Sequence, residues 1–500
     1  MAHGHRSDRC KVVIIGAGPA GLTASYALSK RGVPATVLEA DRVVGGIART
    51  VNYKGFLFDI GGHRFFTKWT EVSQIWNEIL GSKFLERRRL SRIYYHKKFF
   101  YYPLQARNAF FGLGIFESVR ILASYFRSKL FPHRSEENLE GWISNRFGRR
   151  LYEVFFKTYT EKVWGVPCTT IRAEWAAQRI RGLSLTAAIR SALFRTNKQI
   201  LKTLVDRFQY PERGPGQMWE MMADYLLGQG YPVLLERRVI RICHHQRQVA
   251  QVVTRGPGGE ERHEGTHFIS SMPIRDLINA LDPPAPEEIC KAANRLRYRD
   301  FLIVSLIVNR KDVMPDNWLY IHEPQVRVGR IQNFKNWSPA MVPDPHKTCL
   351  GMEYFVFEDD ELWSSSDEKL LELAKRELAK LGLASEDEIE DGVVVRMRKA
   401  YPMYDEAWLE QVEVVRHYLA ENLPNLQLVG RNGMHKYNNQ DHSMMTAMCA
   451  AENICGANHD IWAINTEPDY HEEQRRESAS AAWRPAYAEP RRIEQPASTP

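Results

Sequence analysis

The pattern of apolar and polar positions at the start of the chain predicts a strand, a turn, a helix and a second strand in close succession. Residues 12–15 (VVII) are wholly apolar, and the glycine-rich turn GAGPAG at 16–21 follows them directly. Residues 22–32 have the character of a helix, and 33–40 (VPATVLEA) predict the second strand. This order is typical of a dinucleotide-binding α/β unit.

Later segments predict a helical region and more sheet. Residues 71–210 are rich in helix formers, 366–383 predict a charged amphipathic helix, and 255–265 predict a hairpin-type loop. Strands are expected at 231–236, 237–245, 247–255, 266–272, 301–309 and 349–357, and strand-to-loop transitions at 393–402 and 426–433.

Composition excludes several classes of protein. The hydrophobic content of 44% and charged content of 26% are ordinary for a globular chain, which excludes general disorder. The longest apolar run, 301–308, is too short to span a bilayer, and the polar amino terminus does not resemble a signal peptide. Seven cysteines without a CxxC pair indicate reduced thiols, so we expect a cytoplasmic protein without integral membrane association.

The net charge of +8 suits an anionic small molecule, nucleic acid or an anionic membrane surface, and by itself identifies none of them. Basic runs with aromatic neighbours at 86–101 are explained by an edge hairpin beside an anionic nucleotide, so we do not expect nucleic acid as a partner. The histidines lack further ligands at metal spacing, so we expect no metal site. The sequence leaves the oligomeric state open.

The first glycine turn has the residues that a dinucleotide requires. Gly16 permits a tight turn, Gly18 lets the backbone approach a pyrophosphate, and Gly21 allows close packing of the helix on the strand. The helix amino terminus favours the negative charge of the phosphates. Glu39 ends the second strand, where a ribose-binding carboxylate belongs.

A second glycine turn favours FAD over NAD. Gly45, Gly46 and Arg49 follow Glu39 closely, and Gly430 with Arg431 stands at a strand end before a helix of small and apolar residues. This arrangement resembles the glutathione-reductase-like FAD proteins, in which the second turn also lines the pyrophosphate. NAD as the tightly held dinucleotide is the alternative.

The resemblance implies an α/β fold with a discontinuous Rossmann-like FAD-binding domain, a helical subdomain and a mostly antiparallel substrate sheet. The expected division is a flexible arm at 1–10, an FAD-binding domain at 11–70, 211–272 and 392–470, a mainly helical substrate subdomain at 71–210, an antiparallel sheet domain at 273–391 and a disordered tail at 471–500.

Within the amine oxidase and protoporphyrinogen oxidase-like superfamily, short segments resemble UDP-galactopyranose mutase, especially its eukaryotic form. GGH at 61–63 and NQDHS at 439–443 are the first two matches. The others, in chain order, are YPLQ (102–105), KVWGVP (162–167), AEWAAQR (173–179), WLY (318–320), RIQNFKNWSP (330–339), AYP (400–402) and KY (436–437). Together with the glycine motifs they are spread over residues 11 to about 457, which is most of the chain.

The mutase resemblance implies a redox-neutral reaction on a nucleotide-diphosphate sugar through an adduct with N5 of reduced flavin, for which NAD(P)H is a candidate reductant. It implies catalytic roles for Gly62, His63, Arg179 and Arg330, the two arginines as donors to the diphosphate. The expected FAD-binding residues are Gly16, Gly18, Gly21, Glu39, Gly45, Gly46, Arg49, Gly61, Val239, Gly430, Arg431, Asn439, Gln440 and Ser443. The expected substrate-binding residues are Tyr102, Gln105, Arg179, Trp318, Tyr320, Arg330, Tyr401, Tyr437 and Asn439.

Some positions depart from the mutase pattern. Arg64 and Lys68 stand where the mutase loop has an apolar residue and a histidine, and Thr160 stands where eukaryotic mutases have an asparagine. A true oxidoreductase of the amine oxidase or protoporphyrinogen oxidase type is therefore the second hypothesis. A non-catalytic binding protein similar to the GDP-dissociation inhibitors is the third, although Glu39 and Gly430 favour a bound FAD.

Overall fold

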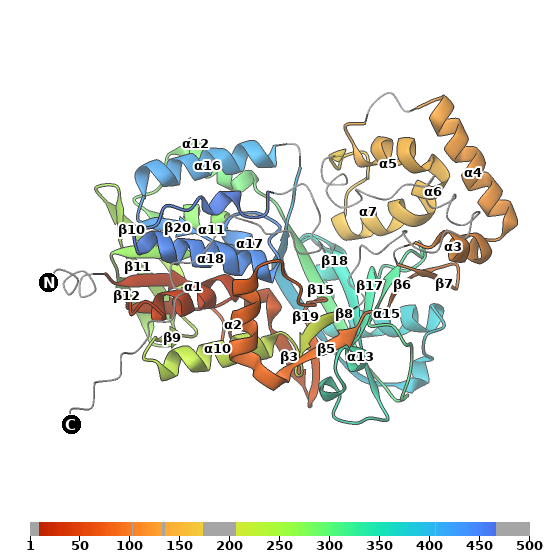
Figure 1. Ribbon diagram of the computed structural model, residues 1–500, viewed down its shortest axis with the longest axis horizontal. Helices are drawn as coiled ribbons and strands as arrows, with labels where there is room; N and C mark the ends of the chain where they lie inside the picture. Colours follow the sequence, from red (N-terminus) through yellow and green to blue (C-terminus); the bar gives the residue numbers. More distant parts are fainter. Residues whose placement is uncertain (1–9, 103, 133–135, 174–206, 406, 467–500) are drawn as a thin grey trace, which may run out of the picture.

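The computed structural model describes residues 10–102, 104–132, 136–173, 207–405 and 407–466. Arg179, the expected arm except Cys10, and the expected tail lie outside these ranges. Within them the chain has an α/β fold with two large sheets, which confirms the predicted fold class (Figure 1).

A parallel five-stranded sheet forms the nucleotide-binding unit. Its strands, in spatial order, are β20 (Leu426–Leu428), β13 (His267–Ser270), β1 (Val12–Ile15), β2 (Ala35–Leu38) and β9 (Val233–Leu234). The helices that share its core are α1 (Pro19–Ser29), α2 (Thr70–Leu80), α10 (Gly216–Gly228), α11 (Ile274–Asn279), α12 (Glu287–Arg295), α16 (Trp408–Asn422) and α18 (Gln440–Ile454). Every residue of β1 is buried, which explains its uninterrupted apolar run.

A smaller sheet extends this unit. It consists of β12 (Gly259–Glu264), β11 (Gln248–Gly256), β10 (Arg238–His245) and β14 (Leu281–Asp282). The expected loop at 255–265 therefore contains a strand, because residues 259–264 pair antiparallel with β11 around a short turn.

The second large sheet has seven strands and forms the floor of the substrate region. In spatial order they are β19 (Ile389–Pro402), β15 (Tyr298–Val308), β18 (Thr348–Val356), β17 (Arg330–Asn333), β16 (Trp318–Ile321), β6 (Ser91–Tyr95) and β7 (Lys98–Tyr101). All pairs are antiparallel except β16 with β6. Strand β15 is buried on both faces, because Leu302, Val304 and Leu306 pack in the core with α15 (Asp367–Lys380), whereas Phe301 and Ile303 pack in the core with β4 (Phe56–Asp59).

The remaining elements connect these sheets. Strand β3 (Thr50–Tyr53) pairs with β4, and β5 (Phe84–Arg88) pairs with β8 (Arg207–Pro211). A helical lobe lies at the end of the molecule away from α1 and α18 (Figure 1). Its helices are α3 (Ala106–Leu113), α4 (Ile115–Leu130), α5 (Leu139–Phe147), α6 (Arg149–Tyr152) and α7 (Thr158–Trp164). Short helices α13 (Phe334–Trp337), α14 (Glu361–Ser364) and α17 (Gly430–Gly433) complete the set of described α-helices.

The division into domains stays a prediction, but one of its boundaries falls inside an observed strand, and two groups of elements join a sheet or core other than the expected one. Strand β19 remains in the seven-stranded sheet up to Pro402, beyond the expected boundary at 392. Strands β6 and β7, within the expected helical region, join the same sheet because β6 pairs with β16. Helices α11 and α12, expected in the sheet domain, pack into the core of the parallel sheet.

A buried carboxyl group anchors the hairpin that precedes the predicted catalytic loop. Asp59, at the end of β4, accepts hydrogen bonds from the Tyr210 hydroxyl and from Thr50 Oγ1, the latter at 2.9 Å. Thr50 Oγ1 in turn accepts a hydrogen bond from Gly216 N at 3.0 Å. Burial raises the pKa of Asp59 to about 7, although both hydrogen bonds oppose this shift.

Asp59→Asn should change how stability depends on pH. Between pH 5 and pH 7 the folded wild type retains the Asp59 proton that the unfolded chain has released, so its free energy of unfolding falls as the pH rises. From pH 5 to pH 7, the free energy of unfolding of the wild type should therefore fall by about 2 kcal/mol more than that of Asp59→Asn. Urea denaturation at both pH values measures it, with exposed Asp224→Asn on α10 as the control. Equal pH dependence of wild type and Asp59→Asn would contradict the assignment.

Candidate active site

A cavity of about 1020 Å³ lies between the carboxyl ends of the parallel strands and the seven-stranded sheet. Of the predicted cofactor residues it is lined by Gly16, Gly18, Glu39, Gly46, Arg49, Gly61, Val239, Gly430, Arg431, Asn439, Gln440 and Ser443. Of the predicted catalytic and substrate residues it is lined by Gly62, His63, Trp318, Tyr320, Arg330, Tyr401, Tyr437 and Asn439. Residues far apart in the sequence therefore meet in one site.

The first glycine turn has the geometry that its sequence predicts. Gly16 has a φ of +99°, and a Cβ added at Gly21 would lie 1.7 Å from the carbonyl oxygen of Gly16. Gly21 thus permits the close approach of α1 to the turn and does not line the cavity.

The two glycine turns form a backbone cradle. A Cβ at Gly46 would lie 3.5 Å from Gly18 Cα, and Gly45 N donates to the carbonyl oxygen of Ala17 at 2.8 Å. Gly45 therefore connects the two turns through a backbone hydrogen bond but does not line the cavity. A side chain on Gly18 would occupy the space above the amino terminus of α1, where the pyrophosphate of FAD fits.

Glu39 lies directly after β2 and closes the same end of the cavity. Its carboxylate accepts hydrogen bonds from Ala17 N at 2.6 Å and from Asp41 N at 2.9 Å. Burial raises the pKa of Glu39, and these backbone donors counteract the shift. The position fits the carboxylate that holds an adenosine ribose. Arg49 forms an ion pair with Asp41, so its charge is partly neutralised at the rim.

At the other end, the loop after β4 places a neutral histidine in the cavity. His63 Nδ1 lies 3.2 Å from the carbonyl oxygen of Gly61, whose φ is +93°. Burial, together with the positive charges of Arg431 and Arg330, lowers the pKa of His63 to about 3, against the opposing effect of the Gly61 carbonyl. A Cβ at Gly62 would lie only 3.0 Å from Gln332 Nε2, so the loop approaches the sheet closely.

The amino terminus of α18 faces this end of the cavity. Residues 439–443 line the cavity, and Asn439 caps the helix. The Gln440 side chain is fixed, because its Oε1 accepts a hydrogen bond from Trp219 Nε1 at 3.1 Å. The field at the amino terminus of the helix favours negative charge on a bound isoalloxazine ring.

An arginine on the sheet is held by a buried carboxylate. Arg330 Nε donates to Glu353, which is fully buried on the neighbouring strand β18, and Gln332 Nε2 donates to the same carboxylate at 2.8 Å. Burial alone lowers the pKa of Arg330, but the charge of Glu353 raises it well above the ordinary value. Arg330 Nη2 points toward the Gly61 loop, 3.9 Å from a Cβ placed on Gly61.

Tyrosines surround this arginine. The rings of Tyr401 and Tyr437 stack at 5.8 Å, and the guanidinium of Arg431 lies 4.7 Å from the centre of the Tyr437 ring. Burial raises the pKa of Tyr401 to about 12, against the effect of Arg330, so its hydroxyl stays protonated and can donate a hydrogen bond. The Tyr159 ring meets the Tyr320 ring edge-on at 5.3 Å.

Two predicted substrate residues lie at the edge of the site. The Tyr102 ring is 4.8 Å from that of Tyr320 but does not line the cavity, and Gln105 is exposed just before α3. Arg179 lies outside the described residues, so its predicted role stays a prediction.

The sequence analysis missed several residues of the site. Glu353, Gln332 and Tyr159 were not identified, although a single carboxylate within the apolar run 349–357 is a signal for Glu353. Among all the residues that line the cavity, arginine and lysine outnumber aspartate and glutamate. The excess includes Arg64, which lies over the Trp318 ring at 5.7 Å, and Arg172. The site is therefore suited to an anionic ligand.

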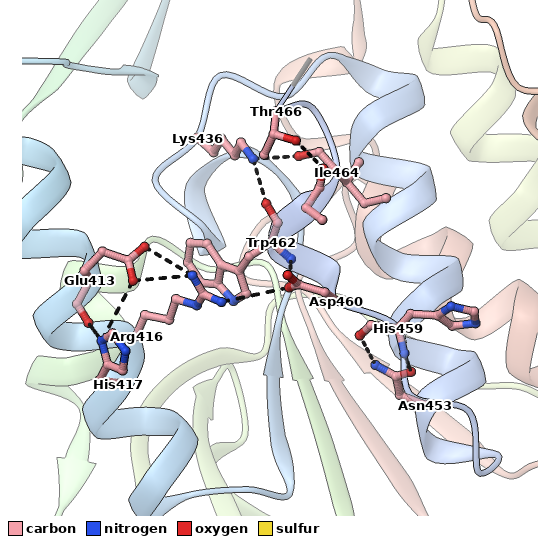
Figure 2. A network of polar contacts seen from close by, with 11 residues as sticks. Glu413, Arg416, His417, Lys436, Asn453, His459, Asp460, Trp462, Ile464 and Thr466 are labelled. Atoms are coloured by element: carbon pink, nitrogen blue, oxygen red, sulfur yellow. Dashed lines mark hydrogen bonds and ion pairs between the residues drawn. The ribbon is translucent and has the colours of Figure 1, made fainter. Parts of the chain in front are cut away.

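The last described segment fastens the loop that carries Tyr437 (Figure 2). Lys436 Nζ donates to the carbonyl oxygens of Trp462 and Ile464 at 3.0 and 2.6 Å. Asn465 Nδ2 donates to the carbonyl oxygen of Tyr437 at 3.1 Å. Burial lowers the pKa of Lys436 to about 8. These contacts fix the backbone on both sides of the residue that faces the cavity.

A comparison with protein families gives the class of the chain. The model described as flavin containing amine oxidoreductase matches residues 19–439. The chain therefore belongs to this family of flavin-dependent enzymes.

Solved structures with the same fold come from more than one kind of enzyme. A reduced UDP-galactopyranose mutase has a TM-score of 0.79 at 21% identity, covering 92% of this chain and 96% of its own. A putative protoporphyrinogen oxidase from Exiguobacterium has a TM-score of 0.68 at 18% identity over 89% and 98%. A putrescine oxidase bound to putrescine has a TM-score of 0.58 at 17% identity over 90% and 99%. At these identities the likeness establishes the fold alone.

Curated relatives match only short segments. Protoporphyrinogen oxidase 2 of Arabidopsis thaliana is 38% identical over 69 residues, which is 14% of each chain. An L-amino-acid oxidase of Crotalus adamanteus is 48% identical over 62 residues, or 12% of each chain. Because the matches span about one seventh or less of these relatives, they do not identify a substrate.

The wild type should purify with about one FAD per chain, which heat or acid should release intact, because the cradle suits a non-covalent cofactor.

Gly18→Val should abolish tight FAD binding without unfolding the protein. The valine side chain fills the cradle between the turns, so FAD affinity should fall at least ~100-fold, about 2.7 kcal/mol. Absorbance and titration of added FAD measure this. Gly228→Val, at a site where a Cβ meets nothing within 4 Å, is the control. Full FAD occupancy in Gly18→Val would remove the pyrophosphate assignment.

Proposed function

We propose that this chain is an FAD-dependent enzyme that acts on a nucleotide-diphosphate sugar in a redox-neutral, pyranose/furanose-mutase-like reaction. The observation that carries the proposal is the guanidinium of Arg330, fixed by buried Glu353 and directed toward the loop of Gly61. A fixed, permanently charged donor beside the predicted flavin end suits a diphosphate. The fold similarity to UDP-galactopyranose mutase supports the same proposal.

The cofactor and the protein divide the work. Bound reduced FAD supplies a nucleophilic nitrogen for chemistry at the anomeric carbon of a sugar. Arg330 binds the diphosphate, and the hydroxyl groups of Tyr401 and Tyr437 donate further hydrogen bonds to it. His63 stays neutral near pH 7, so it orients its neighbours by hydrogen bonding and does not act as a cationic acid. NAD(P)H is the proposed reductant.

The second candidate is an FAD-dependent oxidase or dehydrogenase of the amine oxidase type. The family match and the curated relatives, which include L-amino-acid oxidases, favour it. In that reaction Arg330 would bind the carboxylate of an amino acid, and every turnover would consume an electron acceptor. The two candidates therefore differ in redox stoichiometry and in the ligand that Arg330 recognises.

Substitution of Arg330 tests the recognition of the diphosphate. Arg330→Ala removes a charge-assisted hydrogen bond worth roughly 1.5–3 kcal/mol, which corresponds to a 10- to 150-fold loss of affinity for UDP or another nucleoside diphosphate. Arg330→Lys should restore only part of it, because an ammonium group lacks the planar pair of donors. Arg179→Ala is expected to act similarly from the mutase resemblance.

Isothermal titration at fixed salt measures these affinities, and FAD content verifies that each variant is folded. Arg241→Ala, which removes an exposed arginine that pairs with Glu260, is the matched control. Unchanged diphosphate affinity in both the Arg330 and Arg179 variants would favour the oxidoreductase candidate.

The requirement for reductant tests the reaction class. Activity on a panel of nucleotide sugars should begin when dithionite or NAD(P)H reduces the flavin, and the amount of product should exceed the reductant consumed many times. Product analysis by chromatography with parallel oxygen and peroxide measurement provides both quantities. Peroxide formed one-to-one with product would overturn the redox-neutral proposal.

A further inference from the structure

Helices α3 and α4 lie at the outer edge of the helical lobe (Figure 1). They carry a dense group of exposed apolar side chains. Phe116 is 89% exposed, and Phe131, Leu130 and Phe111 are each at least 70% exposed. The apolar patch, as we define it, consists of Phe110, Phe111, Ile115, Phe116, Val119, Phe126, Leu130 and Phe131. Most of the large exposed hydrophobic side chains in the described ranges belong to this patch, which marks it as an interaction site.

Helix α4 is apolar on two opposite faces. Ile121 and Tyr125 are buried on the face that packs against α5 and α6. Phe116, Val119 and Phe126 recur at spacings of three and seven residues on the other face, which is exposed. Packing within the lobe explains why the inner face of α4 is apolar, but it does not explain the apolar outer face.

The packing of this helix pair argues against a membrane span. Among the described residues no single helix meets the length and hydropathy of a membrane span, whereas residues 107–113 and 115–130 meet it together with a bend of 120° between them. The inner face of α4, however, is committed to the protein. Glu117 pairs with Arg150 of α6, and Gly148 leaves no room for a Cβ beside the Tyr125 backbone.

The charged residues around the patch indicate which kind of surface it binds. Arg107, Arg120, Arg127 and Lys129 are exposed beside the apolar side chains. Glu117 is the one acidic residue between positions 107 and 131, and its carboxylate is engaged by Arg150 and Arg120. A two-fold contact between copies of this chain would bring like charges together, whereas anionic lipid headgroups attract them. Exposed phenylalanines on a basic helix are typical of an interfacial membrane anchor.

We propose that the α3–α4 patch docks this protein peripherally on an anionic membrane surface. Helix α3 begins four residues after Tyr102, whose ring contacts that of Tyr320 in the cavity wall. It is fastened to β7, since Lys98 Nζ donates to the Gly112 carbonyl oxygen at 2.7 Å. Docking therefore involves a segment continuous with one edge of the active site. The proposal does not depend on the identity of the substrate.

Vesicle sedimentation with the FAD-loaded protein tests the proposal. The wild type should sediment with phosphatidylcholine vesicles that contain phosphatidylglycerol, and much less with pure phosphatidylcholine. Phe116→Ser with Phe126→Ser should lower the partition coefficient roughly tenfold or more per phenylalanine, since each loses a buried aromatic side chain. Arg120→Gln with Arg127→Gln should lower it about fivefold per cation, and added salt should weaken wild-type binding.

Leu409→Ser with Leu227→Ser, two exposed apolar residues outside the lobe, provides the matched control and should bind like the wild type. Melting temperature and FAD content verify folding of every variant. Absence of vesicle binding by the wild type overturns the proposal, as does equal binding by wild type and the phenylalanine variant. If sedimentation velocity shows a wild-type oligomer that becomes monomeric in the phenylalanine variant, and vesicles do not bind, the patch is an interface between copies of this chain.

Discussion

One buried ion pair shapes the end of the cavity that holds the predicted catalytic residues. Arg330 and Glu353 stand directly opposite each other on β17 and β18, and Gln332 shares the same carboxylate. Transfer of two charges from water into a protein interior costs several kcal/mol per ion, so such a pair is a poor source of stability. Its effect is to fix the direction of a cation. The register of two strands thereby positions the guanidinium toward the loop of Gly61, and a small error in that register would remove the site.

Glycines, which have no side chain, allow the turns and the loop at the cavity to approach one another and the second sheet closely. Gly18 and Gly46 bring two turns together at the parallel sheet, and Gly62 brings the predicted catalytic loop close to Gln332 on the other sheet. The buried Asp59 holds the hairpin that leads into this loop. The cofactor end is therefore built from backbone groups and helix amino termini, which tolerate little variation. The substrate end is built from side chains on strands, which are free to differ between enzymes of the same fold.

This difference explains which parts of the protein the sequence could predict. The turn of Gly16 and the position of Glu39 follow from local steric rules, and the structure confirms that both lie at the cavity. The fold class was predictable for the same reason. The role of Glu353 was not predictable, because it depends on the pairing of Glu353 with Arg330, 23 positions away on a neighbouring strand, and nothing local distinguishes it from a surface carboxylate. The domain boundary expected at 392 falls inside β19, because a strand can continue in its sheet without any change in the local pattern of apolar and polar residues.

The electrostatics of the cavity explain why the fold alone does not decide the reaction. A putative protoporphyrinogen oxidase, a putrescine oxidase and a mutase share the fold of this chain, so the same fold is found with different reactions. A site for a neutral or cationic amine gains nothing from a concentration of guanidinium groups, since each one repels a cationic ligand. Arg330 and Arg431 lie at the same end as His63, and their positive charges add to burial, the main cause, in lowering the pKa of that histidine. A ligand that brings negative charge would relieve the repulsion between the two arginines, which supports the proposal of an anionic substrate.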